Sequence, residues 1–208
     1  NCVMESKLAV KENHILPVGV DKTIFYKKLN IKKRYDFIFV GSFYNVKGID
    51  IIIEAIRNLK ENEKKISFCF VGSGDYQHEL MKLKEDKFII DIIGTQTHLQ
   101  LAELYNISRF ALAHSRSEGF PTSTLEAMFC GVPVLASNIP QFREQIKNNE
   151  NGWLVELGNI NELSNKLLEL YNLPEKNYLL HSKFAKDSNK NYSLENVIIK
   201  LIKIYKNG

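Results

Sequence analysis

The sequence has little cysteine, and what it has is scattered. Its 208 residues include three cysteines, Cys2, Cys69 and Cys130, with no pair at the spacing of a CxxC motif. An odd number of widely separated cysteines excludes a disulfide framework and a cysteine-based zinc site. Cys69 lies in the apolar run ISFCFVG, which predicts a small buried side chain. These features favour the reducing environment of the cytoplasm.

Long apolar runs are also missing. No stretch approaches the roughly 20 residues that a membrane-spanning helix requires. The first ten residues, NCVMESKLAV, lack the basic and apolar regions of a signal peptide. The chain does not begin with methionine, so we expect a domain that belongs to a longer protein.

Neither basic nor acidic residues are in strong excess. There are 28 Lys and Arg residues against 24 Asp and Glu residues, for a formal net charge of +4. That level favours solubility and does not indicate a nucleic-acid partner. The densest basic stretch, KKLNIKKRY at 27–35, is interpreted as a solvated linker, with contact to anionic lipid or to another domain as the alternative.

Several catalytic signatures are absent as well. The five histidines form no HxH or HExxH pattern, and no GxSxG, Walker or DxD sequence occurs. Gly72 and Gly74 begin a glycine-rich turn, but Gln77 occupies the position of the third glycine of a dinucleotide-binding motif. We therefore expect no bound metal, nicotinamide or flavin.

What the sequence does contain is a regular alternation of short apolar strands and amphipathic helices. The predicted strands cover residues 14–20, 36–42, 66–75, 87–94, 109–115, 132–138 and 151–157. The predicted helices cover residues 48–62, 76–86, 98–108, 123–131, 139–148, 159–172 and 193–206, with Thr97 and Ser193 as N-caps. This order indicates an α/β fold, a doubly wound, Rossmann-like parallel sheet covered on both faces. Ligands of such sheets bind at the carboxyl ends of the strands.

The most informative stretch is SRSEGFPTSTLEAM, residues 115–128. Pro121 favours a helix that starts at 121–123, and the unpaired N–H groups and dipole of a helix start attract an anion such as phosphate. Glu118 precedes this helix and Glu126 lies inside it, with seven residues between them. Carboxylates accept hydrogen bonds from vicinal hydroxyls. The pattern therefore predicts a binding site for a sugar nucleotide, which has hydroxyls at both ends and phosphate between them. The alternative is structural: a helix cap at Glu118 and an exposed Glu126.

Two other side chains follow strand ends. Lys47 comes after the glycine-ended strand at 36–42 and before a helix, where it can reach a diphosphate; a solvated surface lysine is the alternative. His114 ends the strand that precedes Glu118. Its position is consistent with a ligand contact or with a satisfied strand-end histidine.

In order, these motifs resemble one protein family. They are FVGSFYNVKGID, FCFVGSGDY, SEGFPTSTLEAMFCGVPVLAS, NGWLV and YSLENVIIKLIKIYK. From about His14 to its C-terminus the chain resembles the C-terminal, donor-binding domain of the retaining GT-B glycosyltransferases of group 1 (family 4). The spaced glutamates are the most specific signature. The resemblance implies transfer of a sugar from a nucleoside-diphosphate sugar to a glycan, lipid-linked or other acceptor.

The resemblance also implies a role for each site residue. Glu118 and Lys47 would be catalytic, with Glu118 holding hydroxyls of the donor sugar and Lys47 neutralising the diphosphate. The expected sugar- and diphosphate-binding residues are Gly41, Ser42, Lys47, Glu118, Gly119, Phe120, Pro121, Thr122, Ser123 and Thr124. The expected nucleoside-binding residues are Gly72, Ser73, Ile93, Gly94, Leu125 and Glu126, with Glu126 accepting hydrogen bonds from the ribose. No metal and no cofactor is implied, because Lys47 and the helix N-terminus can stabilise the phosphate charge.

Three positions depart from the family pattern. Ser42 stands where the family usually has an arginine after the strand's glycine, so one of two cationic groups is missing. A charged contact contributes about 1.5–3 kcal/mol at a favourable site, so donor affinity is the property most affected. Val18 replaces the usual asparagine of the lead-in, and Pro140-Gln141 replace the usual pair of glycines.

The resemblance divides the chain into three parts. Residues 1–12 would be the trailing edge of a missing N-terminal acceptor domain or a linker, 13–191 the donor domain, and 192–208 a helix that packs back toward the domain junction. The expected partners are a nucleotide sugar, the missing N-terminal domain and a glycan or lipid-linked acceptor, with no nucleic acid. The expected location is cytoplasmic, with peripheral contact at the inner face of the membrane as an alternative. We expect the fragment alone to bind nucleotide and to transfer sugar poorly.

Two other functions stay open at this point. One is a non-catalytic or degenerate nucleotide-sugar-binding module, which Ser42 favours. The other is a GT-B-like sugar-nucleotide epimerase. A phosphorylase would need a pyridoxal-phosphate lysine in the matching context, and the sequence contains none.

Overall fold

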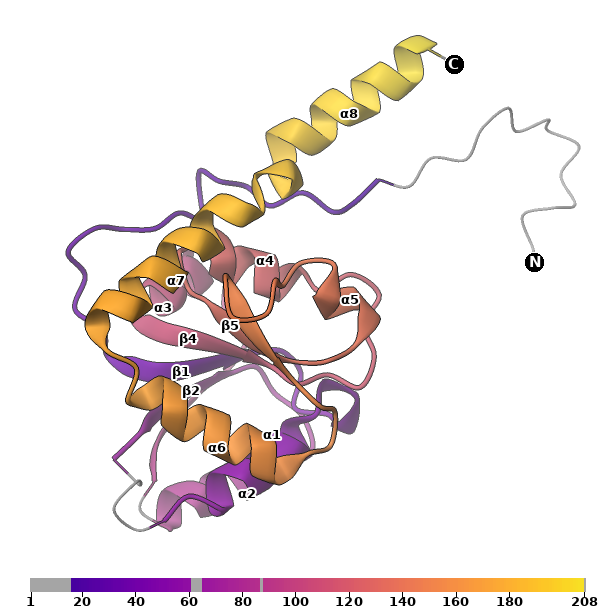
Figure 1. Ribbon diagram of the computed structural model, residues 1–208. Helices are drawn as coiled ribbons and strands as arrows, with labels where there is room; N and C mark the ends of the chain where they lie inside the picture. Colours follow the sequence, from indigo (N-terminus) through magenta and orange to yellow (C-terminus); the bar gives the residue numbers. More distant parts are fainter. Residues whose placement is uncertain (1–15, 61–64, 87, 208) are drawn as a thin grey trace, which may run out of the picture.

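Six parallel strands form a single sheet at the centre of the molecule (Figure 1). The structure is a computed structural model and describes residues 16–60, 65–86 and 88–207. The strands are β1 (Tyr35–Val40), β2 (Ser67–Val71), β3 (Ile89–Ile93), β4 (Ser108–Ala113), β5 (Val134–Ser137) and β6 (Gly152–Val155). Their order in the sheet is β3-β2-β1-β4-β5-β6, and every pair is parallel. The predicted doubly wound α/β fold is confirmed.

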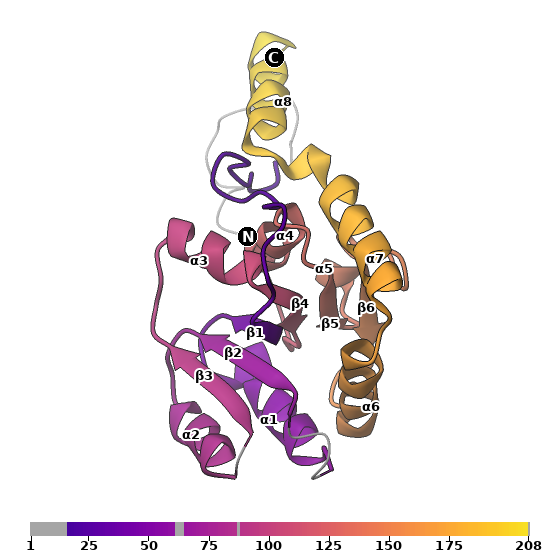
Figure 2. The same cartoon turned by 90° about the vertical axis from the view of Figure 1, so that its left-hand side faces the viewer.

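Helices cover both faces of the sheet (Figure 2). On one face lie α1 (Ile49–Arg57), α2 (Gln77–Glu85) and α6 (Ile160–Tyr171). On the other lie α3 (His98–Asn106), α4 (Thr122–Phe129) and the short α5 (Pro140–Arg143), with α7 (Glu175–Ser188) packed against α4. Two separate hydrophobic clusters result, one on each face of the sheet.

The cluster under α1 is unusually aromatic because phenylalanines face each other across neighbouring strands. Phe37 of β1 pairs in register with Phe68 of β2 and with Phe110 of β4. The ring centroids of these two pairs are 5.5 and 5.6 Å apart. Cross-strand aromatic pairs of this kind stabilise a sheet and define its register.

The helix ends agree with the local signals in the sequence. The Thr97 side chain caps α3 in a reciprocal capping box with Gln100. The Ser193 hydroxyl accepts a hydrogen bond of 3.3 Å from the Asn196 N–H and caps α8 (Leu194–Asn207). Helix α4 starts directly after Pro121, as predicted.

Two predictions about the course of the chain are wrong. Residues 16–19 of the strand predicted at 14–20 form no strand, and Val20 makes only an isolated bridge with Ser193; residues 14 and 15 lie outside the described part. Pro17 has no N–H to donate, which disfavours a strand there. Helix α7 was not predicted, because its buried face consists of Tyr178, Ser182 and Ala185 and therefore gives little apolar periodicity.

The C-terminal helix α8 projects away from the sheet (Figure 1). It follows the 3-10 turn η3 (Lys190–Tyr192). Its start is tied to the lead-in segment by two backbone hydrogen bonds of 2.8 Å, from Val20 to Tyr192 and from Leu194 to Val20. Neither α8 nor any other helix in the described ranges has the length and apolar character needed to cross a membrane.

Replacing Phe110 by alanine tests how far the aromatic cluster supports the fold. The Phe110 ring is fully buried and contacts the rings of Phe37, Trp153 and Tyr178. We expect Phe110→Ala to lower the free energy of unfolding in urea by about 3–5 kcal/mol, because the cavity cannot collapse between paired strands. Leu179→Ala on the exposed side of α7 is the control and should change the free energy of unfolding by about 0.5 kcal/mol or less. A loss below about 1 kcal/mol for Phe110→Ala would contradict the prediction.

Candidate functional site

The strand order places a crevice above β1 and β4. After β1 the chain passes through the 3-10 turn η1 (Asn45–Lys47) into α1 on one face of the sheet. After β4 it passes through residues 114–121 into α4 on the other face. The two connections diverge, so the carboxyl ends of β1 and β4 form the switch point at which doubly wound sheets bind ligands.

Lys47 and Glu118 meet at this switch point. The Lys47 ammonium donates to both carboxylate oxygens of Glu118 at 2.8 Å. The Ser115 hydroxyl donates to the same carboxylate at 2.6 Å. The Lys47 and Glu118 side chains are 31% and 12% exposed, so the ion pair is largely shielded from water. The two residues predicted to be catalytic are thus brought together from different halves of the sheet.

The loop that carries Glu118 is attached to its surroundings by Arg116. The Arg116 N–H donates to the Val46 carbonyl at 2.9 Å, and its guanidinium forms a two-pronged ion pair with Asp50 at 2.7 and 2.6 Å. Burial raises the pKa of Asp50, but hydrogen bonds and charge from Arg116 outweigh it and leave the pKa lowered. Neither Arg116 nor Asp50 was predicted as a site residue, because their pairing depends on β1 lying beside β4.

The amino end of α4 opens onto the same crevice. Pro121 precedes the helix, and no side chain caps its first N–H groups. The Thr124 hydroxyl donates to the Pro121 carbonyl at 2.6 Å and contacts the Gln145 carboxamide, and Leu125 is fully buried. The predicted anion site therefore consists of the backbone at Thr122 and Ser123, while the Thr124 and Leu125 side chains face the protein interior.

Glu126 lies further along α4 on the side that faces α3. Burial raises the pKa of its carboxyl group, and the nearby His98 opposes that shift. Within the described part of the chain the carboxylate forms no hydrogen bond or ion pair. A half-buried carboxylate without a partner is unfavourable, which makes Glu126 suited to accept hydrogen bonds from a ligand.

A hollow of about 230 Å³ lies beside the crevice, over β1 and β2. It is lined by four of the predicted residues, Gly41, Ser42, Gly72 and Ser73, together with Thr95, Gln96, Leu101 and two strand-end valines. Thr95 and Gln96 were not predicted as site residues, although they directly follow β3 and so lie at a strand end. Gly72 has a φ of +142°, and a Cβ there would lie 2.0 Å from the Gly41 carbonyl oxygen, so glycine is required.

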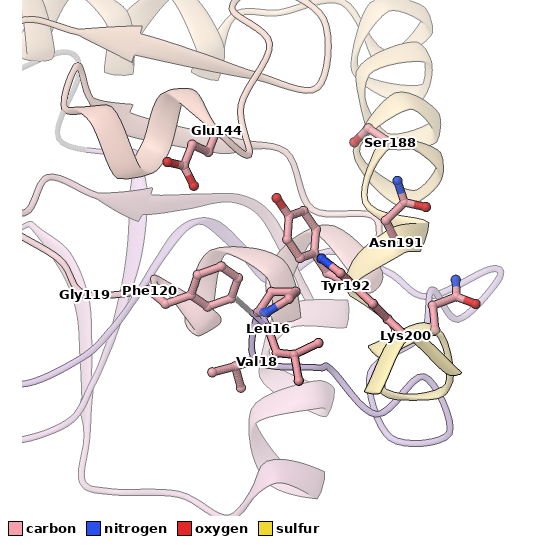
Figure 3. Close-up of a pocket in the computed structure, with 11 residues that line it drawn as sticks. Leu16, Val18, Gly119, Phe120, Glu144, Ser188, Asn191, Tyr192 and Lys200 are labelled. Atoms are coloured by element: carbon pink, nitrogen blue, oxygen red, sulfur yellow. The ribbon is translucent and has the colours of Figure 1, made fainter. Parts of the chain in front are cut away.

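The remaining predicted residues do not line this hollow. The Ile93 carbonyl accepts the Gly72 N–H at 2.8 Å, and Gly94 faces open space. Gly94 and Glu126 do not line the hollow. Gly119 and Phe120 line a second and larger pocket (Figure 3).

His114 is buried directly beneath the crevice. It is 1% exposed, its Nε2 accepts a hydrogen bond from the Gly158 N–H at 3.4 Å, and its Nδ1 has no partner among the described residues. Burial lowers the pKa of the ring to about 4, and Arg116 adds to that effect. Gly48 packs so closely against the His114 carbonyl that a Cβ would lie 1.9 Å from the oxygen. His114 therefore supports the loop from below rather than lining the surface.

Most of the sequence matches a known family model. The model, described as Glycosyl transferases group 1, covers residues 21–190. The chain belongs to the group 1 glycosyl transferases. No group of three or more His, Cys, Asp or Glu side chains that could hold a metal ion occurs among the residues described in this domain.

Individual relatives agree with this family assignment. An uncharacterized glycosyltransferase of Methanocaldococcus jannaschii is 32% identical over 190 residues, which cover 90% of this chain and 51% of that protein. The chain spans about half the length of the curated relatives it matches.

Solved structures of low sequence identity share the fold. The C-terminal domain of a group 1 family protein from Francisella tularensis has a TM-score of 0.72 at 24% identity, covering 85% of this chain and all of that domain. Anabaena HepE, crystallised with UDP and glucose, has a TM-score of 0.75 at 17% identity, covering 93% of this chain and 56% of that one. The predicted fold, the C-terminal half of GT-B, is confirmed.

The buried state of His114 predicts a defined pH dependence of stability. Its pKa is about 4 in the folded protein against 6.5 when solvated, so the unfolded chain binds more protons between these values. The uncharged His114 ring therefore contributes fully to the free energy of unfolding above pH 6.5. This contribution, about 3 kcal/mol, is lost as the pH falls toward 4.

Replacing His114 by glutamine should flatten the curve of unfolding free energy against pH in that interval, as measured by urea denaturation. His78→Gln on the exposed side of α2 should leave the wild-type slope unchanged. Parallel curves for His114→Gln and the wild type would refute the prediction.

Proposed function

We propose that this chain is the donor-binding half of a retaining glycosyltransferase, which transfers a sugar from a nucleoside-diphosphate sugar to a hydroxyl acceptor. The observation that supports it best is the meeting of Lys47, Glu118 and the uncapped start of α4 at the switch point. A cation, a carboxylate and free N–H groups together complement a sugar attached to a diphosphate.

Each part of the donor has a counterpart in this arrangement. The diphosphate lies at the N–H groups of Thr122 and Ser123, where the Lys47 ammonium also reaches it. Glu118 holds hydroxyls of the sugar, and Glu126 holds the ribose. The base lies toward the strand ends at Gly72 and Gly94. Ser42 contributes no positive charge, so Lys47 supplies the cationic contact at this end of β1.

Catalysis in this arrangement is electrostatic. The bond from the anomeric carbon to the diphosphate oxygen breaks, and a bond from that carbon to the acceptor oxygen forms. The acceptor's hydroxyl proton passes to the departing diphosphate. Lys47 and the α4 N-terminus stabilise the charge that develops on the leaving group, while Glu118 orients the sugar. These groups can do so without a metal.

The whole protein contains a further domain in this proposal. Helix α8 exposes several large apolar side chains along its length, among them Leu194, Ile198, Ile202 and Tyr205. A surface helix normally buries such a stripe against a neighbour. We propose that residues 192–208 pack toward the N-terminal domain and that residues 1–12 lead from it. The acceptor is a glycan or a lipid-linked molecule, and the enzyme works in the cytoplasm or at the inner face of the membrane.

Nucleotide binding by the isolated chain tests the donor site. A calorimetric titration with UDP, GDP, ADP and TDP should identify at least one nucleoside diphosphate that binds. Glu126→Gln should weaken that nucleotide about tenfold or more, because a charged hydrogen-bond acceptor for the ribose is lost. Glu85→Gln on the exposed side of α2 is the matched control and should leave affinity unchanged. Absence of binding at millimolar concentration, or equal binding by Glu126→Gln, would exclude this donor site.

The Lys47–Glu118 ion pair leads to a second prediction, which concerns the affinity for the nucleoside diphosphate with and without its sugar. Without a ligand, Lys47 is held by the Glu118 carboxylate, which would also repel a nearby phosphate. Glu118→Gln should therefore strengthen binding of the sugar-free nucleoside diphosphate about fivefold, as expected when one like charge is removed at short range. The same variant should lose the additional affinity that the sugar provides. Weaker binding of the sugar-free nucleotide by Glu118→Gln would show that Glu118 does not compete for Lys47.

A further inference from the structure

Arg116 connects the loop at 114–121 to the η1 turn and to the start of α1. Its backbone N–H donates to the Val46 carbonyl at 2.9 Å. Its guanidinium donates to the Asn45 carbonyl and to both carboxylate oxygens of Asp50, the latter at 2.7 and 2.6 Å. A single residue thus joins the connection after β4 to the connection after β1.

The geometry of the Arg116–Asp50 pair makes this connection rigid. Asp50 lies in the first turn of α1, where the backbone N–H groups of Asp50 and Ile51 favour its charged form. A guanidinium is planar and binds a carboxylate through two parallel hydrogen bonds, which fix its orientation as well as its distance. The Arg116 and Asp50 side chains are 34% and 23% exposed, so water screens the pair only in part. The backbone at Arg116 is therefore held in place relative to α1.

The Lys47–Glu118 pair cannot hold the same loop once a donor is bound. In the proposed function Lys47 binds the diphosphate and Glu118 binds the sugar, so the two side chains separate. Among the described residues, the other hydrogen-bond partner of the Glu118 carboxylate is the Ser115 hydroxyl at 2.6 Å. Ser115 belongs to the same loop and cannot anchor it to α1. The donor needs neither Arg116 nor Asp50, so their pair can persist in the complex.

We propose that Arg116 and Asp50 are positioning residues for the donor sugar, because they keep Glu118 in place after Lys47 has left it. This inference rests on the proposed function, in which Glu118 binds hydroxyls of the sugar. Hydrogen bonds to the sugar add to affinity only by the amount that exceeds the cost of ordering the groups that form them. A loop that is already fixed avoids this cost. The nucleoside diphosphate contacts α4 and Lys47, so its own affinity does not depend on the Arg116–Asp50 pair.

The contribution of the sugar to binding, measured by calorimetry on this chain, tests the positioning role. It is the ratio of the dissociation constant of a nucleoside diphosphate to that of the same nucleotide carrying a sugar. The probes are UDP with UDP-glucose, UDP-galactose and UDP-N-acetylglucosamine, and GDP with GDP-mannose. Asp50→Asn should lower the ratio of the best pair about fivefold and keep the affinity for the nucleoside diphosphate within about twofold. Arg116→Lys keeps the charge without the two-pronged geometry and should lower the ratio by a smaller factor.

Two further measurements distinguish positioning from a general effect on stability. Asp50→Asn combined with Glu118→Gln should show the same ratio as Glu118→Gln alone, because a residue that acts through Glu118 has nothing to position once that carboxylate is gone. The matched control is Arg57→Gln, which removes another arginine–carboxylate pair, with Glu79 at 2.7 Å between α1 and α2. Whatever its effect on unfolding in urea, Arg57→Gln should leave the ratio unchanged.

The ratio in Asp50→Asn and Arg116→Lys decides between positioning and structural support. An unchanged ratio in both variants would show that the pair only stabilises the fold, and the donor site would stand. Equal weakening of both ligands, or an effect of Asp50→Asn that persists in Glu118→Gln, would show that the pair does not act through Glu118.

The wild-type chain separates this inference from the proposed function. If it binds a nucleoside diphosphate but none of the sugars adds to the affinity, Glu118 does not hold the sugar, and the positioning role fails while the nucleotide site stands. If no nucleoside diphosphate binds, the proposed function fails and the positioning role fails with it.

Discussion

The direct pairing of β1 with β4 is the contact on which the rest of this molecule depends. Phe37 and Phe110 are neighbours in the sheet although two complete strand–helix units separate them in the chain. Because β2 and β3 extend the sheet on one side and β5 and β6 on the other, the connections after β1 and β4 leave in opposite directions. The crevice between them is where Lys47 of one half meets Glu118 of the other.

In the absence of a ligand, the charged groups of this crevice stabilise one another. Lys47 is paired with Glu118, Arg116 is paired with Asp50, and His114 is held uncharged beneath the loop. Partly buried charges are tolerated when they are paired. In the proposed function, a nucleoside-diphosphate sugar would replace the first pair with its own phosphate and hydroxyls and leave the second pair in place. The Arg116–Asp50 pair can therefore hold the loop while Lys47 and Glu118 change partners.

Two cavities of the molecule have different linings. The hollow over β1 and β2 is lined by two glycines and two serines together with Thr95, Gln96, Leu101 and two valines. The pocket toward α8 is more than three times larger and carries aromatic rings, a carboxylate and a carboxamide.

Features that depend on neighbouring residues were predicted correctly from the sequence. The short apolar runs predicted the strands from β1 to β6, and the Thr97 cap and the start of α4 after Pro121 were predicted because capping is local. Helix α7 was missed because its buried face is formed by a tyrosine and two small residues, which give too weak a pattern against a polar background. The strand expected at 14–20 was an apolar run without a partner strand.

The sequence by itself determined the class of fold, the family and the glutamates on either side of the α4 start. These follow from periodicity and from short motifs that remain recognisable without three-dimensional contacts. Only the tertiary structure decided that Lys47 bonds to Glu118, that Asp50 anchors Arg116, and that residues 16–18 and α8 meet at Phe120. The reason is physical: which strand ends become neighbours depends on long-range pairing across the whole sheet, and no local stretch of the chain encodes that.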